Sequence, residues 1–369
     1  MLRSFATFFF LLLLLVAGPP ARAQTKAGAP VRVGVAGLTH THVHGLLGRA
    51  KRGDIEIVGI AEPNRALAER FAKQHGLSMT LVYSSLDEML KKTKPEVVTA
   101  FGSIYEHLAV VQACAPRGIH VMVEKPLAVS PDHARQMAAL AAKHRIHLLT
   151  NYETTWYGSN RQAYQLVDQE KAIGDIRKVV VHDGHQGPKE IGVNKEFLDW
   201  LTDPVQNGGG ALVDFGCYGA DLLTWFMHGA RPLSVTAVTR QFKPDVYPSV
   251  DDDATILVTY PKAEGIIQAS WNWPYARKDL EIYGQTGAVF ALDGSHLRVR
   301  RSEKEPAQDL VAPAPPAPYD DPFAYLAAVV RGTSPEDVLS ALPTNLIVVE
   351  ILEAAKQSAR EGKTVYFPK

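Results

Sequence analysis

Cysteine is scarce in this chain, and neither sign of charge is in excess. The 369 residues include two cysteines, Cys114 and Cys217, and 39 Lys and Arg residues balance 39 Asp and Glu residues. Two cysteines far apart in the sequence do not form the disulfide framework of a small secreted domain. A neutral chain without basic runs offers no electrostatic attraction for nucleic acid or for a membrane surface. We therefore expect no nucleic-acid partner.

Near its N-terminus the chain lacks a hydrophobic run long enough to span a bilayer comfortably. The apolar stretch at residues 8–17 is short, follows Arg3 and precedes the small-x-small pattern of residues 21–23, which is typical of a secretory signal peptide. We predict a signal peptide over residues 1–23, a linker over residues 24–30, and an exported protein, periplasmic or extracellular, with no stable membrane insertion after cleavage. No Arg-Arg pair or nearby cysteine indicates twin-arginine export or a lipid anchor. The alternative is an uncleaved membrane tether.

The length of the chain predicts two domains, since about 345 residues exceed what one hydrophobic core usually serves. Residues 31–150 alternate between apolar strand-like runs and helical patterns, which predicts a doubly wound parallel sheet that binds a dinucleotide. Residues 151–369 are richer in strand-like runs joined by hairpin-length turns. They predict an open, mostly antiparallel sheet with helices on one face. The exposed face of such an open sheet suggests oligomer contacts.

The tripeptide Glu124-Lys125-Pro126 follows an apolar run at residues 119–123 that reads as a buried parallel strand. The carboxyl ends of such strands lie beside the cofactor crevice in open α/β sheets. Glu124 and Lys125 are costly to bury there unless they pair or take part in chemistry. Two interpretations remain open: a Glu-Lys pair that caps the strand, or a lysine held at the mouth of a nucleotide site.

The predicted nucleotide loop lacks two of the three glycines of the usual Gly-x-Gly-x-x-Gly fingerprint. Counted from Gly37, Thr39 and His42 stand where the second and third glycines belong. A strand before the loop and a helix after it still favour phosphate binding by Gly37, Thr39, His40 and His42. A metal site on His40 and His44 is the alternative, but no third ligand is evident, and we predict no metal.

The end of the second predicted strand bears on the choice of nucleotide. Glu62 lies 25 residues after Gly37, where a carboxylate accepts hydrogen bonds from a ribose diol and repels a 2′-phosphate. This placement favours NAD over NADP. Arg65, three residues further on, weakens the preference.

A glycine run, residues 208–210, leads into a predicted helix over residues 211–226 that carries Asp214, Tyr218 and Asp221. Spacings of four and three residues place these side chains on one face of the helix. Two interpretations remain open here too. The three groups anchor the packing between domains as buried, satisfied polar side chains, or they belong to a site.

Together these motifs resemble the Gfo/Idh/MocA oxidoreductase family from about residue 31 to the C-terminus. The matching features are Glu124–Pro126, Ser103 with His107 at a helix start, Asn151-Tyr152, Gly174–Ile176, Gly208–Asp221, Gly284 with Gly287, and the segment from Asp321 to Gly332. The resemblance implies a Rossmann domain that binds NAD, with NADP less favoured, followed by an open sheet that forms the substrate site. It also implies a homo-oligomer.

The resemblance assigns catalytic roles to three residues. Lys125 matches the family's active-site lysine and Asp214 the aspartate of its second motif. Many members have a histidine at the position of Tyr218. The tyrosine resembles the variant of the glucose-fructose oxidoreductase and dihydrodiol dehydrogenase branches. A cationic nicotinamide would lower the pKa of Lys125, and Lys125 would lower that of Tyr218. These residues would move the proton while hydride leaves a secondary alcohol carbon of a sugar, polyol or glycoside.

Other positions complete the predicted site. Ser103, His107 and Glu124 are expected at the cofactor. Asn151, Tyr152 and His185 are expected at the substrate together with the three catalytic residues. His185 lies just beyond a strand, where loops line sites, and its alternative role is a structural hydrogen bond.

Two other functions remain open. One is an enzyme that retains its NAD and cleaves glycosides by oxidation, elimination and re-reduction, because an exported protein has no free supply of NAD. The other is a binding or regulatory relic of the fold without turnover, in which Lys125 and Tyr218 do not converge or no cofactor binds.

Overall fold

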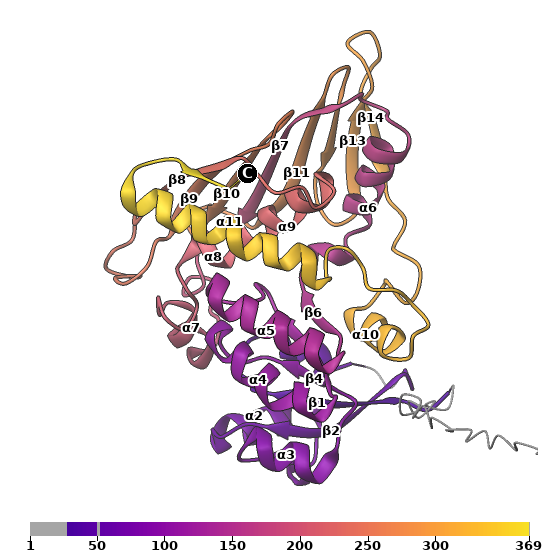
Figure 1. Cartoon of the computed structure of the whole chain (residues 1–369), viewed down its shortest axis with the longest axis vertical. Coiled ribbons are helices and arrows are strands. Elements are labelled where there is room, and N and C mark those ends of the chain that lie inside the picture. The colour runs from indigo at the N-terminus through magenta and orange to yellow at the C-terminus, as the bar shows by residue number, and fades with distance from the viewer. Residues whose placement is uncertain (1–27, 50–51, 369) are drawn as a thin grey trace, which may run out of the picture.

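The computed structural model describes residues 28–49 and 52–368. The predicted signal peptide, residues 1–23, and most of the linker at 24–30 lie outside the described residues. Two domains are stacked along the long axis of the molecule, each built on its own sheet (Figure 1). Within the described residues, no helix is both long and apolar enough to cross a membrane.

The first sheet has the strand order β3-β2-β1-β4-β5-β6, and all neighbouring strands are parallel. Its strands are β1 (Val31–Ala36), β2 (Ile55–Ala61), β3 (Val82–Tyr83), β4 (Val97–Ala100), β5 (His120–Glu124) and β6 (Leu148–Asn151). The connecting helices are α1 (Val43–Leu47), α2 (Arg65–His75), α3 (Leu86–Thr93), α4 (His107–Cys114) and α5 (Pro131–His144). The long strands are mostly apolar because helices cover the sheet. The predicted doubly wound parallel sheet is confirmed.

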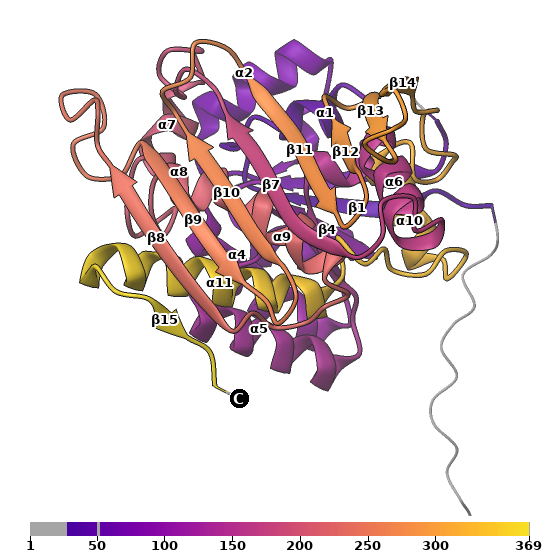
Figure 2. The ribbon, with the colours of Figure 1, turned by 90° about the horizontal axis from the view of Figure 1, so that it is seen from above.

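The second sheet has the order β14-β13-β12-β11-β7-β10-β9-β8-β15, and only the β7–β10 pair is parallel. Its strands are β7 (Ile176–Gly184), β8 (Ser234–Arg240), β9 (Asp253–Thr259), β10 (Glu264–Ser270), β11 (Arg277–Gly284), β12 (Ala288–Ala291), β13 (His296–Arg300), β14 (Gln308–Val311) and β15 (Val365–Tyr366). The expected open, mostly antiparallel sheet is confirmed. Figure 2 views its open face, with α8 (Ala211–Asp214), α9 (Gly216–Phe226) and α11 (Leu342–Glu361) behind it.

The predicted helix over residues 211–226 is broken at Phe215, which separates α8 from α9. Asp214 ends α8, whereas Tyr218 and Asp221 belong to α9. The prediction that the three polar side chains share one helical face is therefore wrong. The break directs Asp214 and Tyr218 toward the other domain and leaves Asp221 fully buried.

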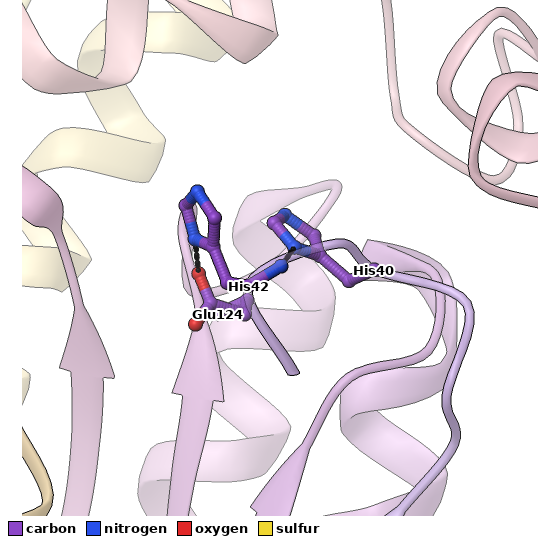
Figure 3. Close-up of side chains that lie close together, drawn as sticks. All are labelled: His40, His42 and Glu124. Atoms are coloured by element: carbon purple, nitrogen blue, oxygen red, sulfur yellow. Dashed lines mark hydrogen bonds and ion pairs between the residues drawn. The ribbon is translucent and has the colours of Figure 1, made fainter. Parts of the chain in front are cut away.

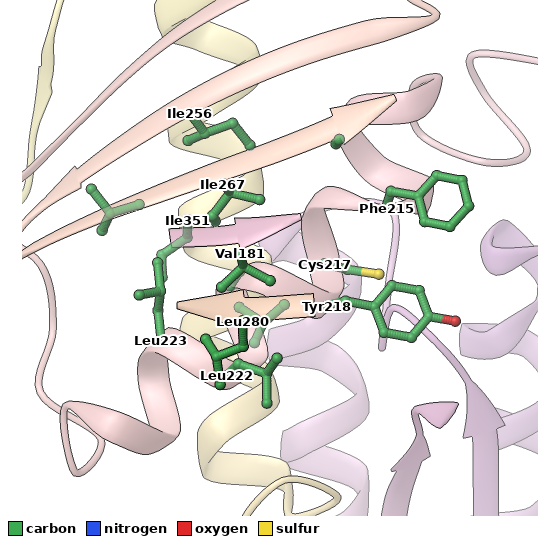
Figure 4. Packing of buried hydrophobic residues seen from close by; sticks show 14 of the residues in the cluster. Val181, Phe215, Cys217, Tyr218, Leu222, Leu223, Ile256, Ile267, Leu280 and Ile351 are labelled. Carbon is green, nitrogen blue, oxygen red and sulfur yellow. The ribbon is translucent and has the colours of Figure 1, made fainter. Parts of the chain in front are cut away.

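Two glycines let α9 lie close against the second sheet. A Cβ atom at Gly219 would lie 2.5 Å from Ile267 Cγ2, and one at Gly265 would lie 2.3 Å from Leu223 Cδ1. Apolar side chains of the sheet and α9 interdigitate around these contacts, joined by Ile351 of α11 (Figure 4). The site helix is thus held against a rigid sheet.

Helix α11 packs against α9 and β8 of the second domain and against α5 of the first. Val349 belongs to the apolar core of the first domain and Ile351 to that of the second. At the start of the helix, Asn345 Oδ1 accepts a hydrogen bond from Tyr152 Oη at 3.0 Å. This helix therefore fixes the relative position of the two halves of the site. Three further helices surround the domain junction: α6 (Gly158–Tyr164), α7 (Lys195–Leu201) and α10 (Pro322–Val330).

Truncation of Ile351 is expected to destabilise the whole protein. The side chain is fully buried, so Ile351→Ala should lower the free energy of unfolding by about 2–5 kcal/mol, measured by urea denaturation. Val311→Ala is the control, since Val311 is 71% exposed and its truncation should change stability little. Equal effects of the two substitutions would contradict the assignment of α11 to the core.

Candidate active site

A cavity of about 500 Å³ opens at the carboxyl ends of β1, β2 and β4. This edge of a doubly wound sheet is where dinucleotides bind. The cavity is lined by the predicted loop, the end of β2 and the start of α4, including Gly37, Thr39, Glu62, Gly102, Glu106 and His107. Among the described lining residues there is no Lys or Arg.

The loop after β1 is held in place by residues that replace its missing glycines. Gly37 has a φ of +79°, and a Cβ atom there would lie 2.8 Å from the amide nitrogen of Gly102, so glycine is required. Thr39 Oγ1 donates to the carbonyl of Phe101 at 3.3 Å and accepts from Trp200 Nε1 at 3.0 Å. Trp200 lies on α7, so the second domain supports the nucleotide loop.

His40, His42 and Glu124 form a hydrogen-bonded set at the end of β5 (Figure 3). His42 Nδ1 lies 2.8 Å from Glu124 Oε2, and His40 Nδ1 accepts from the His42 amide at 3.1 Å. Burial holds the pKa of His40 well below its usual value, so its ring is neutral. The three groups are close enough to share a metal ion, yet each already has a partner. The alternative metal pair of His40 with His44 does not form, because His44 Nδ1 lies 2.8 Å from His75 Nε2.

Glu62 lines the cavity where the ribose prediction places it. Its carboxylate accepts backbone hydrogen bonds from Leu38 at 2.9 Å and Asn64 at 2.8 Å, and burial raises its pKa. Arg65, expected to weaken the preference for NAD, is instead paired with Glu69 on the surface of α2, at 2.8 Å. The nucleotide side of the cavity therefore carries an acid without a compensating arginine.

Ser103 and His107 occupy the turn after β4 and the first turn of α4. Ser103 Oγ donates to Gln206 Oε1 of the second domain at 2.7 Å. His107 Nδ1 donates to the carbonyl of Leu127 at 3.1 Å, while its Nε2 is buried without a partner among the described residues. Burial lowers the pKa of His107 to about 4. Nε2 is thus a free acceptor at the cavity wall, which fits a donor group of a bound dinucleotide.

Lys125, Asp214 and Tyr218 converge from the two domains. Lys125 Nζ lies 2.5 Å from Asp214 Oδ1 and 5.0 Å from the centre of the Tyr218 ring. Asp214 Oδ2 accepts from Trp271 Nε1 at 3.0 Å. Lys125 therefore pairs with Asp214 and not with its neighbour Glu124, which excludes a simple Glu-Lys cap on the strand. The contact between Trp271 and Asp214 was not predicted, because it depends on how the end of β10 packs beside α8.

The protonation states of this group differ from the expected ones. Burial favours neutral Lys125, but the Asp214 carboxylate outweighs it and raises the pKa of Lys125. Burial raises the pKa of Asp214, yet the Lys125 ammonium brings it below its usual value. Burial, and after it the carboxylate of Glu153, holds the pKa of Tyr218 well above its usual value. In the protein alone Lys125 is therefore an ammonium and Tyr218 a neutral phenol, and the expected lowering of the Tyr218 pKa by Lys125 is not found. The lowering of the Lys125 pKa was expected beside a cationic nicotinamide and stays a prediction.

The Tyr218 hydroxyl is available to a ligand. Figure 4 shows the rings of Phe215 and Tyr218 pointing away from the apolar cluster between α9 and the sheet. No hydrogen bond to another described residue engages this hydroxyl, in contrast to that of Tyr152, whose ring lies edge-on to Tyr218 with 5.6 Å between centres. The structure thus gives Tyr152 a supporting position and leaves Tyr218 free to donate.

Asn151 and His185 lie near the group formed by Lys125, Asp214 and Tyr218. Asn151 Nδ2 donates to Glu124 Oε1 at 2.9 Å, and its Oδ1 accepts from Trp156 at 3.0 Å. His185 Nδ1 accepts from the Gly187 amide at 2.9 Å, and burial lowers its pKa. The neutral His185 ring therefore carries its proton on Nε2. The His185 and Phe215 rings pack edge to face with 4.9 Å between their centres. Both residues combine a structural hydrogen bond with a place beside the site.

Comparison with known proteins relates both domains to a family of oxidoreductases. The model of an oxidoreductase family with an NAD-binding Rossmann fold matches residues 31–152, and that of the GFO/IDH/MocA C-terminal domain matches residues 160–290. A trans-1,2-dihydrobenzene-1,2-diol dehydrogenase from Bos taurus is 25% identical over 347 residues, which cover 90% of this chain and 96% of that protein. The enzyme of the same name from Xenopus laevis is 30% identical over 240 residues, or 64% of this chain and 67% of that protein.

Solved structures share the fold. An inositol dehydrogenase homolog complexed with NAD+ from Azotobacter vinelandii has a TM-score of 0.80 at 19% identity, covering 94% of this chain and 100% of that chain. Aldose-aldose oxidoreductase from Caulobacter crescentus, complexed with glycerol, has a TM-score of 0.77 at 20% identity, covering 92% and 100%. The family resemblance is thereby confirmed: the chain is an oxidoreductase with an NAD-binding Rossmann domain and belongs to the Gfo/Idh/MocA family.

Proposed function

We propose that the protein transfers a hydride between NAD and a secondary alcohol carbon of a sugar, polyol or glycoside. The observation that carries the proposal is the convergence of Lys125, Asp214 and Tyr218 at the end of β5, beside the dinucleotide cavity. Similar proteins named as diol dehydrogenases and an inositol dehydrogenase homolog support an alcohol substrate.

The cofactor would lie along the predicted loop and the carboxyl ends of β1, β2 and β4. When bound, NAD supplies the hydride acceptor or donor at its nicotinamide ring. Gly37 and the donors of Thr39, His40 and His42 would hold the phosphates, and Glu62 would accept from the ribose. Glu124 with Asn151, Ser103 and the free Nε2 of His107 would frame the nicotinamide end. The acid at Glu62 supports NAD over NADP.

The proton of the alcohol would move through Lys125 and Tyr218. In the reducing direction, the Lys125 ammonium or the Tyr218 phenol donates to the forming alkoxide. In the oxidising direction, Lys125 Nζ must first lose a proton to solvent, and the neutral amine, held 2.5 Å from Asp214 Oδ1, then accepts the hydroxyl proton. Asp214, fixed by Trp271, thus orients Lys125.

Retention of NAD by a glycoside-cleaving enzyme is a second candidate. Two hydrogen bonds join the domains beside the nucleotide cavity: Trp200 donates to Thr39 of the loop, and Ser103, after β4, donates to Gln206. These contacts support a cofactor that exchanges slowly. Release of stoichiometric NAD from the denatured protein, with no net redox change in a cleaved glycoside, would establish this function. Exchange of NAD at each turnover would exclude it. The convergence of Lys125 and Tyr218 speaks against the relic interpretation, and a failure to bind NAD or NADP would favour it.

Export and self-association belong to the same proposal. We infer a protein that is exported by the signal at residues 1–23 and that forms a homo-oligomer through the open face of its second sheet. Fractionation of expressing cells should place the mature chain outside the cytoplasm, and light scattering should give a mass above that of one chain. A cytoplasmic, monomeric protein would contradict both inferences.

Replacement of the lysine should abolish turnover without loss of the cofactor. Lys125→Met removes the proton-transfer group, so kcat should fall by about 10²–10⁴-fold, while the Kd for NAD, measured by calorimetry, changes little. Lys91→Met is the control, since Lys91 lies on the surface of α3 with its side chain 68% exposed. Full activity of Lys125→Met would contradict the proposed role.

The carboxylate of Glu62 should set the choice of nucleotide. The unmodified protein is expected to bind NAD more tightly than NADP, and Glu62→Gln should weaken NAD binding by about tenfold, because a charge-assisted hydrogen bond is replaced by a neutral one. Calorimetric titration with both nucleotides measures this, with the surface variant Glu69→Gln as control. Unchanged preference in Glu62→Gln would show that the ribose lies elsewhere.

The pH dependence should differ between the two directions. Because the pKa values of Lys125 and Tyr218 are raised, both groups are protonated at neutral pH. Alcohol oxidation, which needs a deprotonated acceptor, should accelerate as pH rises, whereas carbonyl reduction should hold steady and then decline in the alkaline range. Initial rates in both directions across about pH 6–10 test this. An oxidation rate that declines above neutral pH would be inconsistent with these protonation states.

A further inference from the structure

A second group of polar side chains lies on the inner face of the second sheet, next to Tyr218. Asp183 of β7 and Lys278 of β11 stand directly opposite each other in the antiparallel register, so their side chains share one face of the sheet. Lys278 Nζ lies 4.6 Å from the centre of the Tyr218 ring and forms an ion pair with Glu153. Tyr157 Oη also donates to Glu153, at 2.7 Å.

Asp183 is the member of this group without a partner. Its side chain is 1% exposed, its Oδ1 is unsatisfied, and no described residue forms a hydrogen bond or an ion pair with it. Two other buried carboxylates nearby are satisfied: Asp214 by Lys125 and Trp271, and Asp251 by the backbone amides before α8 and within it. A buried carboxyl group without a partner lowers stability, so its place beside a site indicates a ligand.

The charges felt by Asp183 place it in the active site. Its pKa is held well above the usual value first by burial, against the attraction of Lys278 and Lys125, with Glu153 adding to the increase. If Asp183 loses its proton, its charge in turn raises the pKa of Tyr218. The carboxyl group therefore lies within electrostatic reach of both predicted proton-transfer groups, and its proton makes it a donor as well as an acceptor.

The donors and acceptors of this group match hydroxyl groups. A protonated carboxyl donates one hydrogen bond and accepts another, as an alcohol does. Lys278 has three N–H donors, of which the ion pair with Glu153 engages one. An apolar portion of a substrate placed here would leave the Asp183 carboxyl and the Lys278 donors desolvated and unpaired.

We propose that Asp183, with the Lys278–Glu153 pair, binds hydroxyl groups of the substrate other than the one that reacts and so selects polyhydroxylated substrates over simple diols. This inference rests on the proposed dehydrogenase function and specifies the substrate class of the same site. Asp183 is a specificity-determining residue in this account, and the hydride and proton still move at Lys125 and Tyr218.

The test compares a polyol with a diol that has no further hydroxyl groups. The full mature chain is assayed with NAD and either myo-inositol or trans-cyclohexane-1,2-diol, and kcat/KM is measured for each. The unmodified protein should prefer the polyol. Asp183→Leu, which keeps the size of the side chain, should lower kcat/KM for the polyol at least tenfold and leave that for the diol nearly unchanged, through KM and not kcat.

Asp221→Leu is the matched control. Asp221 is likewise a fully buried carboxyl without a partner among the described residues, but it lies away from Lys125 and Lys278, and the charge that it feels is that of Asp337. Both variants should raise the melting temperature, because each removes an unsatisfied carboxyl. Only Asp183→Leu should change the ratio of polyol to diol. An equal ratio in Asp183→Leu and the unmodified protein would overturn the inference and leave the dehydrogenase function standing.

Binding without turnover separates this inference from the proposed function. Calorimetric titration of the protein with myo-inositol in the presence of NADH reports the polyol site even if no alcohol is oxidised. Loss of binding in Asp183→Leu but not in Asp221→Leu, with no turnover in any protein, would support the hydroxyl site and reject the dehydrogenase. Equal binding by all three proteins would reject the hydroxyl site.

Discussion

The ion pair between Lys125 and Asp214 joins the two domains at the point where both supply the site. Lys125 follows β5 of the nucleotide domain, and Asp214 ends α8 of the second domain. Neither charge is stable in this buried position without the other, since an unpaired buried charge is strongly destabilising. The break at Phe215 aims Asp214 at the lysine, and Trp271 fixes its second oxygen. The position of Tyr218, one turn later in α9, follows from the same contact.

The departure of the nucleotide loop from the glycine fingerprint has a structural explanation. The positions that lack glycine are occupied by side chains that bond outside the loop: Thr39 to Trp200 of α7 and His42 to Glu124 at the end of β5. The loop is therefore shaped by both domains, whereas the usual fingerprint relies on close backbone approach alone. Under the proposed placement of NAD, cofactor binding at this loop would be coupled to the domain junction.

Much of the fold followed from local patterns, and the site followed in part. The apolar runs and helix signals of residues 31–150 predicted the parallel sheet, and Glu124-Lys125-Pro126 predicted the lysine that the structure pairs with Asp214. The break at Phe215 was missed, because the apolar pattern of residues 211–226 continues across it and its one local signal, Gly216, is also tolerated inside helices. The pairing of Lys278 with Asp183 was missed because it depends on strand register. The hydrogen bond from Trp271 to Asp214 was missed because it depends on packing between the sheet and α8. A single sequence does not reveal that Lys278 stands opposite Asp183, and the protonation of Tyr218 depends on burial that only packing determines.

A crystal structure of the mature chain with NAD bound tests the central claim most directly, through the position of the nicotinamide ring. The account predicts that the ring lies at the end of β5 and faces Lys125 and Tyr218. Its C4 atom should leave room for a substrate carbon about 3–3.5 Å away. Density for the nicotinamide directed away from Lys125, with the Lys125–Asp214 pair sealed from the cofactor by protein, would contradict it.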